Sequence, residues 1–292
     1  AHVGNRHNRQ ISGQTYPFSQ LPRNILKTPY FSFQVLSLSY CLLYNLIAKE
    51  VFKLNFTIDS KGWGDTSLQY IYELLEGVQN CFYEHFESNA NVAPFTVAHI
   101  DSPNPDDDAM CIRELQLILL NTGDRHWCQF VYQFAHEYCH YQIRKDVVKS
   151  MRWFEESICA TASIFYLIHL SELWSVNPPN EYWGKHSTDF KDYAVYMLQQ
   201  HEEFDTDFSH LDSEMLIYLC NYEYDRLKNR YIARKFLPIF EAHPFLWQAV
   251  PFLADLTEGL TFAESLKEWA FAAPPICWEG ISEIAHVFNV DI

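Results

Sequence analysis

The chain of 292 residues is long enough to bury a core as one large domain or two smaller ones. Its 48% hydrophobic and 16% aromatic residues exclude a disordered protein, and its net charge of −16 argues against a nucleic-acid partner, because binding to phosphates needs clustered Lys and Arg. The eight cysteines are scattered without a C-x-x-C pair, which is typical of buried thiols in a reducing compartment. We therefore expect a cytoplasmic protein.

The N-terminal region, residues 1–50, offers an alternative location. Four basic residues and no acid precede an uncharged run at residues 31–48: Arg6, Arg9, Arg23 and Lys27. A basic flank before such a run is typical of a membrane anchor or an export signal. Polar residues such as Gln34 and Asn45 make the run weakly apolar for a spanning helix, so we expect a buried helix here. Membrane attachment or export through residues 31–48 is the alternative.

The next part of the chain is expected to form a small sheet. Apolar and polar residues alternate with the period of a strand at residues 52–58, and further strands are predicted at residues 94–100 and 111–120. A helix capped by Asp65 or Thr66 should run to Phe86 after the first strand, because apolar residues recur at spacings of three and four. The acidic segment at residues 101–108 is predicted to be a solvated turn.

Two helices should follow the sheet strands. The first, at about residues 125–144, has an apolar stripe on one side and Asp124 as its expected N-cap. The second, at about residues 153–173, is apolar nearly all round, which is typical of a buried helix.

Asn177-Pro-Pro-Asn180 ends this unit, and the rest of the chain has helical periodicity. Helices are predicted at residues 188–204, 212–240, 244–256, 262–271 and 281–290. The expected domains are an N-terminal arm with an apolar helix (1–50), a core (51–176) and a helical C-terminal subdomain (177–292). The predicted fold class is α+β, with a small mixed sheet and an all-helical C-terminal region.

The first of the two central helices carries His136-Glu137-Tyr-Cys-His140. Its two histidines lie one turn apart on one face, a geometry in which two imidazoles can hold one Zn²⁺. Glu137 then lies beside the metal, where a carboxylate can take a proton from a metal-activated water. The third ligand would be a carboxylate, that of Glu156. It lies near the start of a helix that is too apolar to bury a charge without a partner.

The alternative interpretation of each residue is structural. Glu155 and Glu156 are also typical of first-turn acids stabilised by the helix dipole, and one of the pair is expected to be only that. His136 and His140 also fit two polar residues at the edge of a core stripe. Three ligand types at workable spacing favour the metal site, with zinc as the expected metal.

The segments at residues 136–140 and 153–159 resemble those of the gluzincin zinc metallopeptidases, whose third ligand is a Glu on the helix after H-E-x-x-H. Trp153-Phe-Glu-Glu156-Ser-Ile-Cys159 is similar to the Trp-Leu-x-Glu-x-x-Ala box of thermolysin-like aminopeptidases. The resemblance covers residues 52–173 and implies a zincin-like core with His136, His140 and Glu156 as zinc ligands. It implies Glu137 as the general base and places Glu155 at the variable position before the ligand.

The chain departs from that family in two respects. No Gly-x-Met-Glu-Asn-type segment precedes the motif, so the amine-anchoring site of aminopeptidases is not supported. Cys139 and Cys159 replace small or apolar residues. A thiol could compete as a ligand, but Cys139 should point away from a metal that His136 and His140 face.

Gluzincins also use a downstream Tyr or His to donate to the oxyanion of the tetrahedral intermediate. His210 is the leading candidate because it lies where a helix is expected to open at a suitable distance after Glu156. The alternatives are Tyr182, His186, Tyr218 and Tyr222. The strand at residues 112–120 should be the sheet edge above the zinc, with which an extended peptide would pair.

The sequence therefore predicts a zinc-dependent peptide-bond hydrolase acting on a peptide or protein substrate. Zinc would bind a water, Glu137 would deprotonate it, and the downstream donor would stabilise the oxyanion. One alternative is a binding or regulatory protein that keeps the zinc site without turnover, and another is a helical scaffold in which the motif is accidental. The pattern sets neither the cleavage mode, endo or exo, nor the oligomeric state.

Overall fold

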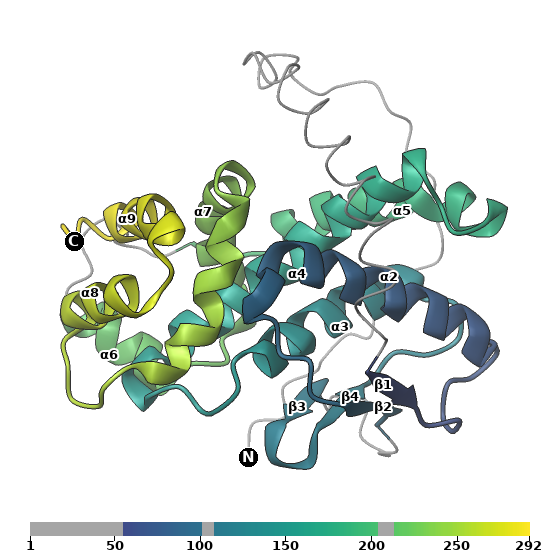
Figure 1. Cartoon of the computed structure of the whole chain (residues 1–292), viewed down its shortest axis with the longest axis horizontal. Coiled ribbons are helices and arrows are strands. Elements are labelled where there is room, and N and C mark those ends of the chain that lie inside the picture. Colours follow the sequence, from purple (N-terminus) through teal and green to yellow (C-terminus); the bar gives the residue numbers. More distant parts are fainter. Residues whose placement is uncertain (1–54, 101–107, 204–212) are drawn as a thin grey trace, which may run out of the picture. The chain divides into compact units, whose positions relative to one another are not determined.

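The computed structural model describes residues 55–100, 108–203 and 213–292. Residues 53–292 form one compact unit. The expected N-terminal region, including the apolar run at residues 31–48, lies outside the described residues. The fold is α+β, with a small mixed sheet and many helices (Figure 1).

The strands are β1 (Phe56–Ile58), β2 (Phe95–His99), β3 (Met110–Ile112) and β4 (Leu117–Leu120). The α-helices are α2 (Leu68–Phe86), α3 (Trp127–Gln142), α4 (Arg152–Val176), α5 (Glu181–Gln199), α6 (Ser213–Asn221), α7 (Arg226–Ala242), α8 (Phe262–Ala272) and α9 (Trp278–Val287). The 3₁₀ segments are η1 (Glu87–Asn89), η2 (Arg113–Leu115), η3 (Lys149–Met151), η4 (Pro244–Asp255) and η5 (Pro275–Cys277).

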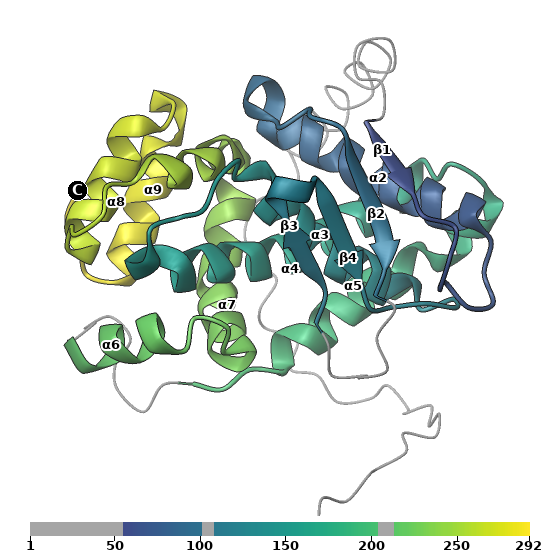
Figure 2. The same ribbon diagram turned by 90° about the horizontal axis from the view of Figure 1, so that it is seen from below.

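The four described strands lie in the order β1-β2-β4-β3. β1, β2 and β4 are parallel, with Phe56 opposite Phe95 and Val97 opposite Ile118, while β3 runs antiparallel to β4. Helices α2 and α3 cover one face of the sheet (Figure 2), where Phe95 packs against Phe134 and other aromatic rings. The core between sheet and helices is therefore largely aromatic.

The single strand expected at residues 111–120 is wrong. The segment forms a hairpin, in which η2 connects β3 to β4 and Gln116 adopts a left-handed conformation at φ 51°. β4 is paired on both sides, so only the β3 part of this segment is an edge strand; β1 forms the other edge of the described sheet. The turn carries no Gly, Pro or Asn, so it lacks the usual signal, and the side chain of Arg113 anchors it by donating to the carbonyl of His140 at 2.9 Å.

The helix caps also differ from expectation. Ser67, and not Asp65 or Thr66, caps α2 by accepting from the N–H of Tyr70. Asp124 does not cap α3. It has a φ of 53°, and its carboxylate accepts from the N–H of Asp65 at 2.7 Å, which ties two loops together.

Helix α4 is the centre of the unit and packs against α3, α5 and α7. It is buried nearly all round, as expected, and with η3 it is the one helix in the described parts of the chain that is long and apolar enough to cross a membrane. Of its most apolar window, 78% is buried inside the fold, which is typical of a core helix. The expected boundary at residue 177 falls at the turn between α4 and α5, inside the compact unit.

The helix expected at residues 212–240 is wrong as a single element. It is divided into α6 and α7, because Asp225 begins α7 by accepting from the N–H groups of Leu227 and Lys228. The hydroxyl of Tyr218 donates to the same carboxylate at 2.6 Å. The break places the connection between α6 and α7 beside α3, where it borders the site described next.

Candidate metal centre

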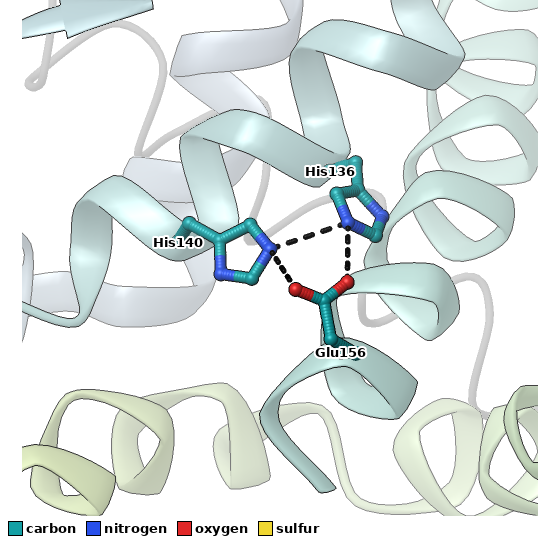
Figure 3. Close-up of side chains that lie close together, drawn as sticks. All are labelled: His136, His140 and Glu156. Carbon is teal, nitrogen blue, oxygen red and sulfur yellow. Dashed lines mark hydrogen bonds and ion pairs between the residues drawn. The ribbon is translucent and has the colours of Figure 1, made fainter. Parts of the chain in front are cut away.

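The side chains of His136, His140 and Glu156 converge between α3 and the start of α4 (Figure 3). Glu156 Oε2 lies 3.2 Å from His136 Nε2, and Glu156 Oε1 lies 3.3 Å from His140 Nε2. The two Nε2 atoms are 3.2 Å apart. The periodicity of α3 places both histidines on one face, and the packing of α4 against α3 brings the carboxylate to them.

These distances fit a metal ion. Around a tetrahedral ion with bonds of about 2.0–2.2 Å, neighbouring ligand atoms lie roughly 3.3–3.6 Å apart. The separations of 3.2–3.3 Å are close to that range, with each histidine facing a different oxygen of Glu156, and one ligand atom from each residue lies within 4.8 Å of the other two. The group could therefore hold a metal, although two imidazoles and one carboxylate also suit metals other than zinc.

The other nitrogen of His140 is held by Glu155, whose Oε1 lies 2.7 Å from His140 Nδ1. Arg113 pairs with the same carboxylate and with Asp146, and it reaches the site from the β3–β4 hairpin. Glu155 is only 5% exposed. The expectation that one of the two glutamates is merely a first-turn acid is therefore wrong, because Glu155 fixes the ring whose Nε2 faces Glu156.

Glu137 lies beside the group and is 6% exposed. Burial raises the pKa of its carboxyl, and Glu156 adds to the rise, while His136, His140 and the N–H of Cys111 act against it. The carboxyl accepts a hydrogen bond from that N–H, so the edge strand β3 orients it. A carboxyl with a raised pKa is better matched to moving protons near neutral pH than an exposed one.

Charge is strongly coupled within the site. Burial by itself would lower the pKa of His140, but the carboxylates of Glu156 and Glu155 outweigh it and hold that pKa well above its usual value. Burial would raise the pKa of Glu156, but the charge of His140 and hydrogen bonds from both histidines hold it well below. A cation is therefore favoured between these groups, either a proton or a metal ion.

The group opens onto a cleft of about 710 Å³. One wall is α3 with the start of α4, and the opposite wall comes from the α6–α7 connection and α7, with Tyr224, Arg226 and Arg230. Tyr224 is 69% exposed. Burial raises the pKa of its hydroxyl, the charge of Glu156 adds to the rise, and the charge of His140 acts against it.

Of the expected oxyanion donors, none that the structure describes lines this cleft. His210 lies outside the described residues. Tyr182 and His186 line a separate pocket, in which the hydroxyl of Tyr182 accepts from Trp127 Nε1 at 2.8 Å. Tyr218 and Tyr222 are not among the residues that line the cleft. Tyr224, two residues beyond the last candidate, was missed because one tyrosine among 18 carries no sequence signal of its own.

Two of the neighbouring thiols are buried in the core, and a third lines the cleft. Cys139 and Cys159 are fully buried and hydrogen-bonded to each other, as expected for Cys139. Burial raises the pKa of Cys111, which lines the cleft, to about 12. Burial also raises the pKa of Cys159 well above its usual value.

Comparison with known protein families, with curated proteins and with solved structures finds no match. What the site can do therefore follows from its own residues.

Proposed function

We propose that the protein is a zinc-dependent peptide-bond hydrolase related in its site to the gluzincin metallopeptidases. The single observation that carries the proposal is the convergence of His136, His140 and Glu156 at a cleft, with the buried carboxyl of Glu137 beside them. The order of a mixed sheet, the helix with the two histidines and the following helix with the glutamate supports a zincin-like core.

Each residue has a role in this reaction. His136, His140 and Glu156 would hold the zinc, which when bound acts as a Lewis acid and lowers the pKa of a water molecule. Glu137 takes the proton from the attacking water and delivers it to the leaving amine, a role open to a carboxyl that lies beside the group. Glu155 and Arg113 keep the ring of His140 in place during these steps.

The substrate would lie along β3. This strand is one of the two edge strands of the described sheet, and its residues Met110 and Cys111 line the cleft. An extended peptide can add to such an edge through main-chain hydrogen bonds, which position a scissile bond without selecting side chains.

Among the described residues, Tyr224 is our candidate for the oxyanion donor. Its side chain lines the cleft, and its hydroxyl responds to the charges of Glu156 and His140. Burial raises its pKa, so the hydroxyl stays protonated and able to donate near neutral pH. His210, outside the described residues, stays a prediction for the same role.

The proposal is tested by metal analysis and by peptide cleavage with Glu137→Gln. The purified chain should hold about one zinc, and the variant should keep the metal while hydrolysis falls by about 10²–10⁴-fold, the usual contribution of a general base. Glu114→Gln is the matched control, because Glu114 is exposed in the η2 turn and does not line the cleft. A chain that takes up no stoichiometric metal would contradict the proposal, and zinc without cleavage of any peptide in a broad library would indicate a binding protein.

A further inference from the structure

The wall of the cleft opposite His136, His140 and Glu156 carries an arginine, Arg230, that has no acidic partner among the described residues. Four arginines line the cleft. Three of them each face a carboxylate among the described residues: Arg113 faces Glu155 and Asp146, Arg152 faces Glu223, and Arg226 faces Asp108. Arg230 pairs with no acidic residue in the described ranges, and its Nε donates to the main-chain carbonyl of Arg226 at 3.1 Å. Its terminal amino groups are therefore available to a ligand.

Two tyrosine hydroxyls accompany Arg230. Tyr132 of α3 and Tyr193 of α5 line the same cleft, and their rings meet edge to face with centroids 6.1 Å apart. Neither hydroxyl has a hydrogen-bond partner among the residues that the structure describes, although both side chains are partly buried. Both hydroxyls are therefore free to bind water or a ligand in the cleft.

The three groups lie close enough to act together. Burial raises the pKa of Tyr132, and that of Tyr193 to about 12, while the charge of Arg230 acts against the rise at both hydroxyls. Both tyrosines therefore remain neutral donors near neutral pH. A guanidinium and two phenol hydroxyls from three different helices form a set of donors suited to one anionic, planar group.

Helix geometry places Tyr132 relative to the histidines of the candidate metal centre. Tyr132 precedes His136 by four residues of α3, about 6 Å along the axis. One residue of an extended peptide spans roughly 3.3–3.6 Å, so this separation corresponds to about two residues. Because Tyr132, Arg230 and the His136–His140–Glu156 group line the same cleft, we expect a ligand group bound by Tyr132 and Arg230 to lie about two residues from a peptide bond at that group.

We propose that Arg230, with the hydroxyls of Tyr132 and Tyr193, binds a carboxylate of the ligand that occupies the cleft. The inference rests on the proposed function for the statement that the ligand is a peptide cleaved at the zinc group. The carboxylate is either an acidic side chain next to the scissile bond or the free C-terminus of a short peptide. A carboxylate matches the planar fork of Arg230, and a neutral amide of the same shape would leave its charge unpaired.

The test uses the full chain and four hexapeptides that are identical except at two places. One position carries Glu or Gln, and the C-terminus is free or amidated. Binding is measured by calorimetry in the zinc-loaded Glu137→Gln protein, and cleavage is measured as kcat/KM in the wild type. We expect one carboxylate to improve binding by about 10–100-fold, the range of a charge-assisted hydrogen bond. The arm that shows the gain identifies the source of the carboxylate.

The variants assign that gain to the three residues. Arg230→Gln should remove it, whereas Tyr132→Phe and Tyr193→Phe should each reduce it by about 2–10-fold, as expected for neutral hydrogen bonds. Arg234→Gln is the matched control, since Arg234 lies one turn further along α7, is exposed and does not line the cleft. It should keep the full preference, and thermal melting should show that all variants are folded.

The outcomes separate this inference from the proposed function. If Arg230→Gln removes the binding preference and no peptide is cleaved, the carboxylate site is supported and the proposed hydrolase is contradicted. Cleavage with equal kcat/KM for all four peptides would retain the hydrolase and overturn the carboxylate site. A carboxylate preference that persists in a folded Arg230→Gln protein, or no preference in binding, would also overturn it.

Discussion

Two histidine pairs in this protein have nearly the same geometry and opposite surroundings. The rings of His136 and His140 lie 4.9 Å apart at 66°, and those of His85 on α2 and His169 on α4 lie 4.8 Å apart at 74°. At the first pair the pKa of His140 is held well above its usual value, whereas at the second the pKa of His85 is lowered to about 3.

The difference comes from what faces the ring nitrogens. At the first pair both Nε2 atoms point to one carboxylate, Glu156. At the second, His85 Nδ1 donates to the carbonyl of Cys81 at 2.7 Å, and its ring packs edge-on against Phe165. Burial, and next the charge of His169, therefore lower the pKa of His85 and favour its neutral form. Ring proximity is thus insufficient for a metal site, which also needs free nitrogens converging with a carboxylate.

The largest expected effect comes from Glu156→Gln. It removes the charged ligand shared by both histidines and should weaken zinc binding by more than about 100-fold, because partners outside the coordination sphere already contribute about 10–100-fold. Glu84→Gln is the matched control, as Glu84 Oε2 lies 3.5 Å from His169 Nε2 in the second pair. Competition with a chromogenic chelator measures the zinc affinity of both variants. Equal losses of affinity would contradict the assignment of the metal to the first pair.

Zinc removal should produce the next largest effect. Free zinc at about 100 times its Kd stabilises the folded state by about 2.7 kcal/mol, which for a unit of this size corresponds to roughly 5–10 °C in Tm. The wild type and His85→Gln should both show this shift between zinc and chelator, and Glu156→Gln should show almost none. Calorimetric melting checks this, and a shift that disappears with His85→Gln would mean that the second pair takes part in metal binding.

Glu155→Gln should have a smaller effect. The variant weakens the hydrogen bond to His140 Nδ1 and leaves Arg113 without its buried partner, so zinc affinity should fall by about 10–100-fold. Asp146→Asn is the control, since Asp146 contacts the same arginine but is largely exposed. If both substitutions leave zinc affinity unchanged, the hydrogen bond from Glu155 does not position the ring of His140 for the metal.

The smallest effect concerns acid stability at the second pair. Because the folded-state pKa of His85 is about 3, below its unfolded value of about 6.5, its contribution is present above pH 6.5 and is lost as the pH falls toward 3. Between pH 7 and 5 the wild type should lose about 1–2 kcal/mol more of its free energy of unfolding than His85→Gln. Urea titrations with chelator present measure this, and parallel losses would place the titrating group elsewhere.

Much of the helical structure was predictable because it depends on local spacing. The helices expected at residues 125–144 and 153–173 are Trp127–Gln142 and Arg152–Val176 in the structure. The β3–β4 hairpin was not predictable, because its turn depends on Arg113 reaching the carbonyl of His140. The capping role expected of Asp124 failed for a similar reason, since its carboxylate is taken by Asp65, 59 residues away.

The sequence by itself determined that His136 and His140 share one face of a helix, because helical periodicity acts over four residues. It also pointed to Glu156 as their carboxylate partner. Only the tertiary structure decided that the adjacent Glu155 faces the other nitrogen of His140, since the rotation of α4 against α3 is set by packing along both helices. The same holds for Arg230, which lies opposite α3 through contacts that no local pattern encodes.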